Sequence, residues 1–248
     1  MKKYLPFIIL LVGVIVLVGA FLFVKNKNKN VDIEEGEETI PEIALKDRPF
    51  VSLTPSEDGH WLNLKIERIR VSADSLDYEL LYNLPDGRIQ GVPGTIKLEG
   101  SGSIERKLLM GSESSGKFRY DEGVKDGSLS LKFRDEEGKL AAKFMTDFNL
   151  FSHTETLVSK DNKFSFNLSS VPKTGFFIVM QTFGLPKDYD GNVEAGPYGI
   201  FSSTDGTENG EVALEDANRQ FYFGGDDWVK IEEDKTYGIG VFIGTSES

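Results

Sequence analysis

Apolar and polar side chains alternate along extended stretches of this sequence. Between Leu140 and Leu150, apolar residues and one threonine occupy every second position, and the positions between them include Lys143, Asp147 and Asn149. A period of two is typical of a half-buried β-strand, because successive side chains of a strand point to opposite faces. The same alternation predicts strands in four more segments, which are residues 61–66, 78–82, 128–134 and 237–243.

Three local patterns add detail to this prediction. The segment from Gly175 to Phe183 is apolar on both faces, which is typical of a central strand. After Ile66 the apolar phase shifts by one residue at Glu67-Arg68, which predicts a β-bulge. A short helix is predicted near residues 213–218, and it is the one helical segment that we expect beyond the first thirty residues.

Turn-forming residues separate the predicted strands, as in Asp126-Gly127 and Asn209-Gly210. Short strands at regular spacing with such turns predict an all-β fold of antiparallel, immunoglobulin-like β-sandwich domains. A boundary near Phe151 would divide the chain into a first domain of residues 49–151 and a second domain of residues 152–248. The alternative is one continuous β domain of about 200 residues.

The first thirty residues follow a different pattern. Residues 4–24, YLPFIILLVGVIVLVGAFLFV, carry no charge, and as a helix at about 1.5 Å per residue they reach roughly 31 Å, the thickness of a hydrocarbon core. We predict a transmembrane signal anchor within residues 1–30 that binds the lipid bilayer, with the N-terminus inside and the C-terminal region extracytoplasmic. The alternative is a signal peptide that is cleaved near Ala20, which would give a secreted protein. Residues 31–48 are rich in acidic side chains and predict a flexible linker.

Charge and composition limit the partners and the chemistry. The formal net charge is −12, and the sequence contains no cysteine. A negatively charged surface repels phosphate groups, so we expect no nucleic-acid partner. Without cysteine, the chain cannot form disulfides, thiol nucleophiles or zinc–thiolate sites.

No catalytic motif emerges, and we expect a protein that is not an enzyme. The G-x-S-x-G pattern is absent, and His60 and His153 have no partners at the spacing of a zinc site or a catalytic triad. Some aromatic side chains could form a sugar-binding site by stacking on sugar rings, although core packing explains aromatic residues in strands more simply. The candidates for such stacking are Trp61, Tyr189, Tyr198, Tyr222 and Trp228.

The best-formed local constellation is the segment DGTENGEVALED, residues 205–216. Oxygen-bearing side chains at alternate positions, with a glycine for a sharp turn, are what a calcium-binding loop needs. The candidate metal ligands are Asp205, Thr207, Asn209, Glu211 and Asp216. Calcium is the one cofactor that the sequence suggests, and the alternative is an acidic hairpin loop without a metal.

The layout of the chain resembles that of uncharacterised exported, membrane-anchored bacterial proteins with immunoglobulin-like or fibronectin-III-like β-sandwich domains. The resemblance is carried by the anchor, the charged stalk, and the stretches LDYELLYNLPDGRIQGVPG and GSESSGKFRYDEGVKDGSLSLKF. It implies a sandwich fold outside the cytoplasm and no particular activity.

Three functions are compatible with this layout. We expect a non-enzymatic binding or spacer module, with a protein or a glycan as its ligand, because sandwich loops and sheet faces serve binding well. One alternative is a membrane-tethered sensor or assembly factor that acts with another membrane protein. The other is an extracytoplasmic hydrolase that uses carboxylates, which a pocket lined by acids with raised pKa values would favour.

Overall fold

The computed structural model describes residues 42–205 and 207–245. The predicted anchor with its orientation, the cleavage site near Ala20 and residues 31–41 of the predicted linker lie outside the described residues. Within the described ranges, no helix is both long enough and apolar enough to cross a bilayer. The described residues group into one compact unit.

The end of the predicted linker is bonded to this unit. Residues 45–47 form a turn of 3-10 helix, η1 (Leu45–Asp47). The guanidinium of Arg48 donates to the carbonyl oxygen of Ile43 at 2.7 Å, and Arg70 donates to the carbonyl oxygen of Lys46 at 2.6 Å. The chain therefore joins the unit beside the connection that carries Arg70.

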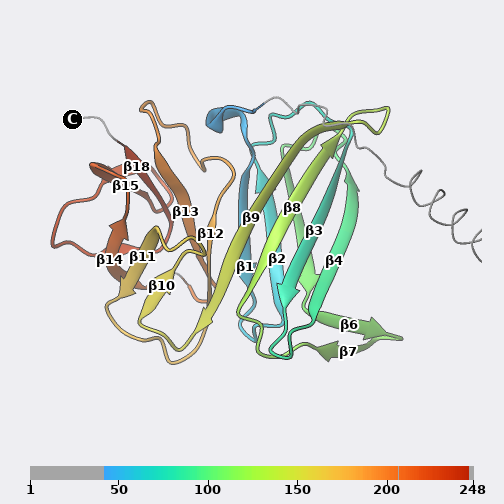
Figure 1. Ribbon diagram of the computed structural model, residues 1–248, viewed down its shortest axis with the longest axis horizontal. Helices are drawn as coiled ribbons and strands as arrows, with labels where there is room; N and C mark the ends of the chain where they lie inside the picture. The colour runs from blue at the N-terminus through green and yellow to red at the C-terminus, as the bar shows by residue number, and fades with distance from the viewer. Residues whose placement is uncertain (1–41, 206, 246–248) are drawn as a thin grey trace, which may run out of the picture. The chain divides into compact units, whose positions relative to one another are not determined.

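The prediction of an all-β, antiparallel architecture is confirmed. The largest sheet has nine strands, and all of its neighbouring strands are antiparallel (Figure 1). Its strands, in spatial order, are β16 (Trp228–Lys230), β15 (Arg219–Phe223), β18 (Val241–Thr245), β13 (Ala195–Ser202), β12 (Phe176–Gln181), β9 (Leu140–Ser152), β8 (Asp126–Arg134), β3 (Ser75–Asn83) and β4 (Ile89–Lys97).

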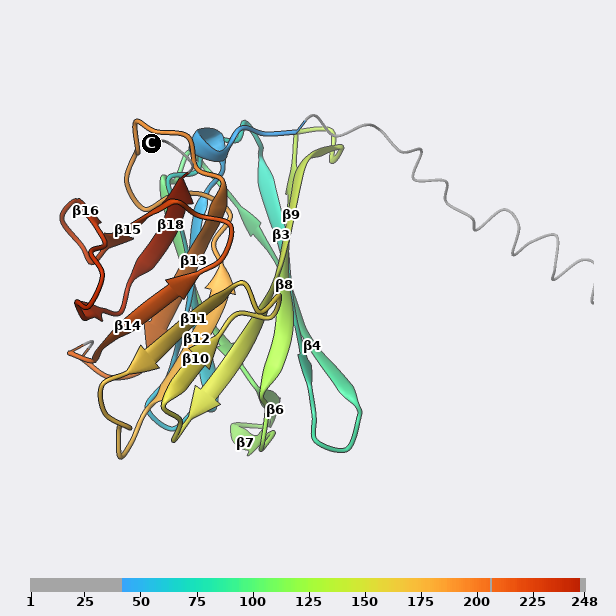
Figure 2. The same cartoon turned by 60° about the vertical axis from the view of Figure 1, so that its left-hand side comes forward.

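Two smaller sheets and a separate hairpin complete the described structure (Figure 2). The three-stranded sheet contains β1 (Phe50–Pro55), β2 (Trp61–Glu67) and β5 (Ser103–Leu109). The four-stranded sheet contains β10 (Thr156–Val158), β11 (Phe164–Leu168), β14 (Asn209–Leu214) and β17 (Tyr237–Gly238). The hairpin contains β6 (Gly111–Ser114) and β7 (Lys117–Tyr120).

Strand β12 contributes to two hydrophobic cores. Phe177 and Val179 lie in the core under the four-stranded sheet, whereas Ile178 and Met180 lie in the core under the three-stranded sheet. Because side chains alternate along a strand, the two small sheets cover opposite faces of the large sheet. This explains why the segment from Gly175 to Phe183 is apolar on both faces, and the prediction of a central strand is confirmed.

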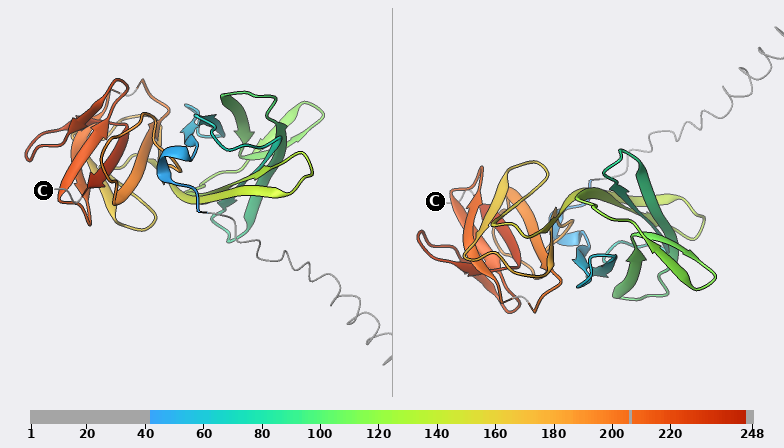
Figure 3. Two further views of the ribbon diagram at one scale, coloured as in Figure 1. Left: turned by 90° about the horizontal axis from the view of Figure 1, so that it is seen from above. Right: turned by 90° about the horizontal axis from the view of Figure 1, so that it is seen from below.

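The large sheet is continuous across the predicted domain boundary. Strand β9 ends at Ser152, and it pairs with β8 on one side and with β12 on the other. Each half of the chain nevertheless supplies most of one core, and the two halves form separate lobes in the views of Figure 3. The division into domains of residues 49–151 and 152–248 stays a prediction, and its test is given in the Discussion.

Two local predictions are wrong. Strand β2 ends at Glu67, and Arg68 adopts a φ of 56°, so the phase shift marks a turn out of the sheet and not a bulge. No helix forms at residues 213–218, because β14 extends to Leu214 and is held in its ladder by β11. Asp216, with a φ of 59°, then turns the chain. At residues 213–214 backbone pairing with β11 therefore decides the outcome, whereas the ladders of β2 end at Glu67 and the left-handed φ of Arg68 turns the chain away.

The segment 237–243, predicted as one strand, is divided between two sheets. Tyr237 and Gly238 pair with β14, whereas Val241 begins β18 in the large sheet. A Cβ atom at Gly240 would lie 2.3 Å from the carbonyl oxygen of Phe223, so only a glycine allows this crossing.

Candidate functional site

The hairpin β6–β7 projects from the end of the molecule that lies opposite η1 (Figures 1 and 2). Its residues are almost all exposed, and a two-stranded hairpin alone is marginally stable. Its base is tied to the body by two backbone hydrogen bonds. The amide of Met110 donates to the carbonyl oxygen of His60 at 2.9 Å. The amide of Asp121 donates to the carbonyl oxygen of Met110 at 3.0 Å. The phenol of the buried Tyr82 donates to the Asp121 carboxylate at 2.8 Å.

Four aromatic rings, which we call the aromatic row, join the hairpin to the loop before β2 and to β2 itself. Trp61 meets Phe118 edge-on with ring centroids 5.6 Å apart, and Phe118 and Tyr120 are parallel with centroids 6.1 Å apart. Tyr120 stacks on His60 at 4.1 Å and an interplanar angle of 8°. These are attractive ring geometries, and they hold the hairpin in place.

Two rings of the aromatic row are exposed to solvent, whereas His60 and Trp61 are half-buried. Phe118 is 45% exposed and Tyr120 is 37% exposed, and they are the two aromatic side chains among the strongly exposed large hydrophobic residues of the described chain. Both lie on β7. Exposed aromatic rings that gather on one projecting element mark a binding surface more often than exposed single aliphatic side chains do.

A pocket of about 390 Å³ lies beside Trp61 on the outer face of the three-stranded sheet. The strand register places Thr54 opposite Asn63 and Asn63 opposite Lys107, so side chains of all three strands meet on this face. The pocket is lined by Thr54, Pro55, Ser56, Trp61, Asn63 and Lys107. One wall of the pocket is therefore a member of the aromatic row.

Asn63 has one satisfied and one unsatisfied group. Its Nδ2 donates to the Glu105 carboxylate at 2.6 Å, which fixes the orientation of the amide. Its Oδ1 is buried and has no hydrogen-bond partner among the described residues. A buried acceptor without a donor is costly in a folded protein, and because this atom has no exposed surface, it does not itself offer a contact to a molecule in the pocket.

A second pocket, of about 500 Å³, lies beside His60 at the other end of the aromatic row. Three acids, Asp58, Asp121 and Glu122, and one base, Lys125, line it, and the His60 Nε2 lies 3.9 Å from a Glu122 carboxylate oxygen. A hydrogen bond from Ser56, followed by one from the backbone amide of His60, lowers the pKa of Asp58. This end of the row is therefore negatively charged at neutral pH.

The hydrolase alternative finds no support in the acidic groups. In the described part of the chain, every carboxyl group with a shifted pKa is shifted downward, mostly by hydrogen bonds from hydroxyl, amide, guanidinium or ammonium groups. A general acid at neutral pH needs the opposite shift. The expectation that the protein is not an enzyme stays a prediction.

The candidate calcium ligands are spread along an extended segment. Thr207 donates to the Asp205 carboxylate at 3.2 Å, whereas Asn209 and Glu211 lie on β14. Asp216 follows β14 and pairs with Lys163 at 2.8 Å. At about 3.3 Å per residue, the strand separates its two ends by roughly 17 Å. The structure therefore brings Asp205 and Thr207 together but does not gather the five side chains around one point.

We expect calcium and a chelator to give the same melting temperature for the full chain. A ligand that binds the folded state raises the melting temperature, and an extended ladder strand does not wrap an ion as a calcium loop does. Differential scanning fluorimetry with calcium chloride or with EGTA measures this. A stabilisation by calcium that Asp205→Asn abolishes would contradict the expectation and restore the calcium loop.

The five aromatic residues named as candidates for sugar stacking lie in different environments. Only Trp61 belongs to the aromatic row, where it is half-buried. Tyr198 is 1% exposed in the second core, and Tyr222 packs on Phe242 in that core. Tyr189 and Trp228 pack against each other, with ring centroids 5.7 Å apart.

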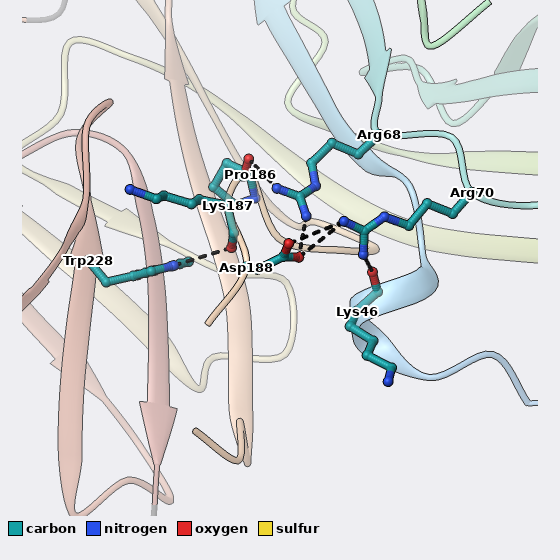
Figure 4. Close-up of polar contacts among 7 residues, drawn as sticks. All are labelled: Lys46, Arg68, Arg70, Pro186, Lys187, Asp188 and Trp228. Carbon is teal, nitrogen blue, oxygen red and sulfur yellow. Dashed lines mark hydrogen bonds and ion pairs between the residues drawn. The ribbon is translucent and has the colours of Figure 1, made fainter. Parts of the chain in front are cut away.

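Trp228, which packs on Tyr189, belongs to a junction that ties loop 184–194 to distant parts of the chain. The Trp228 indole donates to the carbonyl oxygen of Lys187 at 3.2 Å (Figure 4).

Two arginines hold the other side of this loop. The Asp188 carboxylate binds both Arg68 and Arg70, and Arg68 donates to the carbonyl oxygen of Pro186 at 3.1 Å. Hydrogen bonding from Arg70, together with the charges of both arginines, lowers the pKa of Asp188. These charges satisfy one another, so the junction has a structural role.

Tyr198 also anchors a polar network at the edge of the second core. Its phenol donates to the Asp161 carboxylate at 2.7 Å, and Ser159 donates to the same carboxylate at 2.5 Å. Partial burial alone would raise the pKa of Asp161, but the hydrogen bonds from Ser159 and Tyr198 outweigh it and lower the pKa. The ionised form of Asp161 is therefore stabilised by folding.

Replacing Asp161 by asparagine is expected to make the free energy of unfolding decrease less as the pH is lowered. A lowered folded-state pKa gives stabilisation that is complete above the ordinary aspartate pKa of about 4 and is lost as the pH falls through the folded-state value. Urea unfolding of both proteins from neutral to acidic pH measures the difference. Asp190→Asn, at an exposed loop position, is the control, and parallel curves for the wild type and Asp161→Asn would contradict the prediction.

Comparison of this chain with family models, with curated proteins and with solved structures finds no match in any of the three. The resemblance to exported proteins with immunoglobulin-like domains therefore stays a prediction, and the aromatic row with its two pockets is the site on which a functional proposal rests.

Proposed function

We propose that this protein is a non-enzymatic binding module, tethered to a membrane by its N-terminal segment, and that it contacts its ligand with the aromatic row. The observation that carries the proposal is the exposure of Phe118 and Tyr120 on a projecting hairpin, in contact with Trp61 and His60. Aromatic side chains supply large contact areas with few rotatable bonds, which is why they dominate binding surfaces.

The position of the row within the body supports the proposal. The described chain begins at the end of the body that carries η1, and the hairpin lies at the opposite end (Figures 1 and 2). We extend the proposal to the predicted orientation, in which the C-terminal region is extracytoplasmic.

The binding part of the proposal is tested with the full chain in lipid nanodiscs. Three probes cover different ligand classes: a neutral N-acetylglucosamine hexamer, an anionic galacturonate hexamer and a proline-rich dodecapeptide. The double variant Phe118→Ala/Tyr120→Ala removes two exposed rings and leaves both cores intact. We expect it to weaken the binding of at least one probe by about tenfold or more, as for an interface hot spot.

The control variant is Met145→Ala, which removes a side chain that is 70% exposed on β9, away from the hairpin. It should bind like the wild type. If no probe binds, or if the double variant binds as well as the control, the aromatic row is not the binding surface and the proposal fails.

The placement of the protein is tested separately, by protease treatment of intact cells that express the chain with a C-terminal tag. Loss of the tag without lysis supports the extracytoplasmic orientation. A tag that stays protected until the cells are lysed would overturn it.

A further inference from the structure

Strand β5 is a free edge of the three-stranded sheet, since β2 is its one strand partner among the described residues. The amide of Met110, just beyond β5, donates to the carbonyl oxygen of His60, just before β2. Because backbone groups alternate in direction along a strand, the even-numbered residues of β5 also bond to β2, and the odd-numbered residues direct their N–H and C=O groups away from it. These outward residues are Ser103, Glu105, Lys107 and Leu109. The edge therefore presents a row of backbone donors and acceptors with which another strand can pair.

The other terminal strands do not offer such an edge. On β4 the amide of Leu98 donates to the carbonyl oxygen of Asp74, so the odd-numbered residues face outward there as well, and Pro93 among them has no N–H to donate. Strands β10, β16 and β17 contain two or three residues each. Strand β1 is buried at five of its six positions and packs against β12 and β13. With seven residues and no proline, β5 is the open edge within the described part of the chain.

Strand β5 has the sequence SIERKLL, which is complementary to itself when two copies run antiparallel. If the two copies are related by a two-fold axis at Arg106, Glu105 of each copy lies opposite Lys107 of the other, and Ile104 lies opposite Leu108. Opposite charges and apolar pairs directly across a ladder are stabilising. An axis at Glu105 or at Lys107 would instead place like charges opposite each other and leave two residues of each β5 without a partner. The charges therefore select the axis at Arg106.

We propose that two copies of this protein associate by antiparallel pairing of their β5 strands about a two-fold axis at Arg106. The pairing joins the two three-stranded sheets into one continuous sheet and gives the outward backbone groups of both strands a partner. A second copy is the occupant that the strand itself specifies, because its charges and its apolar residues match in this register. The inference goes beyond the proposed function and does not depend on the aromatic row.

Arg106 limits the strength of this contact. Its guanidinium donates to the outward carbonyl oxygen of Glu105 at 2.8 Å, and its side chain is exposed although its position on the strand faces the core. At the two-fold axis it lies opposite Arg106 of the second copy, where two positive charges repel. We therefore expect a weak, reversible dimer, and we expect Arg106→Thr to strengthen dimerisation by about fivefold.

Disulfide cross-linking tests the register, and the chain has no cysteine of its own that would interfere. In the proposed pairing the two Arg106 residues form a pair without mutual hydrogen bonds, with Cα atoms about 4.5 Å apart, within the range of a disulfide. We expect the full chain with Arg106→Cys to form a covalent dimer on mild oxidation in detergent, where the copies are free to take the antiparallel orientation. The control is Lys97→Cys, at an exposed position of β4. A cross-linking yield no higher than that of the control would overturn the proposal.

Sedimentation equilibrium of the full chain in detergent measures the association without a cross-link. We expect Glu105→Lys and Lys107→Glu each to weaken dimerisation by about tenfold, because each places like charges opposite each other at two symmetric positions. Lys107→Glu keeps the hydrogen bond between Glu105 and Asn63, so it reports on charge alone. The double variant Glu105→Lys/Lys107→Glu restores opposite charges and should dimerise like the wild type.

Three results would contradict the β5 dimer. They are a wild type that stays monomeric up to about 100 µM, single variants that associate like the wild type, and a double variant that associates no better than the single variants. Melting curves of all variants show that each is folded. Because Phe118 and Tyr120 are unchanged in these variants, failure of the dimer leaves the proposed binding function standing.

Discussion

Replacing Phe177 by alanine is expected to lower the free energy of unfolding by about 3–5 kcal/mol, the cost of a large cavity in a well-packed core. Phe177 is 1% exposed, and it lies on the central strand β12 between Phe151 of β9 and Ser202 of β13. Its ring occupies the second core, where surrounding rings such as Phe164, Phe166 and Phe242 cannot all shift to fill the space.

Urea unfolding, followed by tryptophan fluorescence and by circular dichroism, measures this effect. Val229→Ala, at an exposed position on β16, is the control and should stay close to the wild type. The companion variant Ile178→Ala opens a cavity in the first core, because Ile178 points to the other face of the same strand.

The pair of variants also tests the predicted domain boundary. If the nine-stranded sheet unfolds as one unit, both variants shift a single transition, since β12 belongs to both cores. Two resolved transitions, each shifted by only one variant, would support two independently folding domains. A loss of less than about 1 kcal/mol for Phe177→Ala would contradict the tight packing of the second core.

Replacing Gly111 by alanine is expected to displace the β6–β7 hairpin and to destabilise the protein locally by about 1–3 kcal/mol from backbone strain. Gly111 has a φ of 152°, a value that side chains other than glycine rarely adopt, and a Cβ atom there would lie 2.2 Å from the carbonyl oxygen of Arg119. Because that carbonyl belongs to the partner strand β7, relief of the clash separates the strands and moves Phe118 and Tyr120.

Limited proteolysis detects this change, since Lys117 and Arg119 on β7 become trypsin sites when the hairpin opens. Gly102→Ala is the matched control, because a Cβ atom there meets no atom within 4 Å. Binding of the probe that the wild type recognises should weaken together with the faster cleavage. Equal cleavage of Gly111→Ala and Gly102→Ala would show that the hairpin tolerates the side chain.

The candidate site was only partly predictable. Trp61 was identified as a residue that could stack on a sugar, but Phe118 and Tyr120 were not. A signal for them exists in the sequence, because the two rings are two positions apart after the Gly/Ser-rich turn of GSESSGKFRY, and therefore share one face of a strand. No pattern indicates that His60 and Tyr120, sixty residues apart, stack face to face.

The junction at Asp188 shows the same limit. Arg68 and Arg70 are 120 and 118 residues away from Asp188 in sequence, and each looks like an ordinary surface charge. Charged side chains are common in loops, so the sequence gives no reason to pair these three rather than others. Their contact depends on how the loop after β12 folds over the body.

Local periodicity was enough to identify β2, β3, β8, β9 and the central position of β12, because side-chain alternation and two-sided apolarity follow directly from strand geometry. The antiparallel arrangement was predicted from the turn residues and the short spacing between strands. Tertiary pairing decided the rest. It held residues 213 and 214 in a ladder where a helix was expected, and it divided residues 237–243 between two sheets. It also assembled the aromatic row, because rings from β2, the loop before it and a hairpin sixty residues later meet only when the three-stranded sheet has formed.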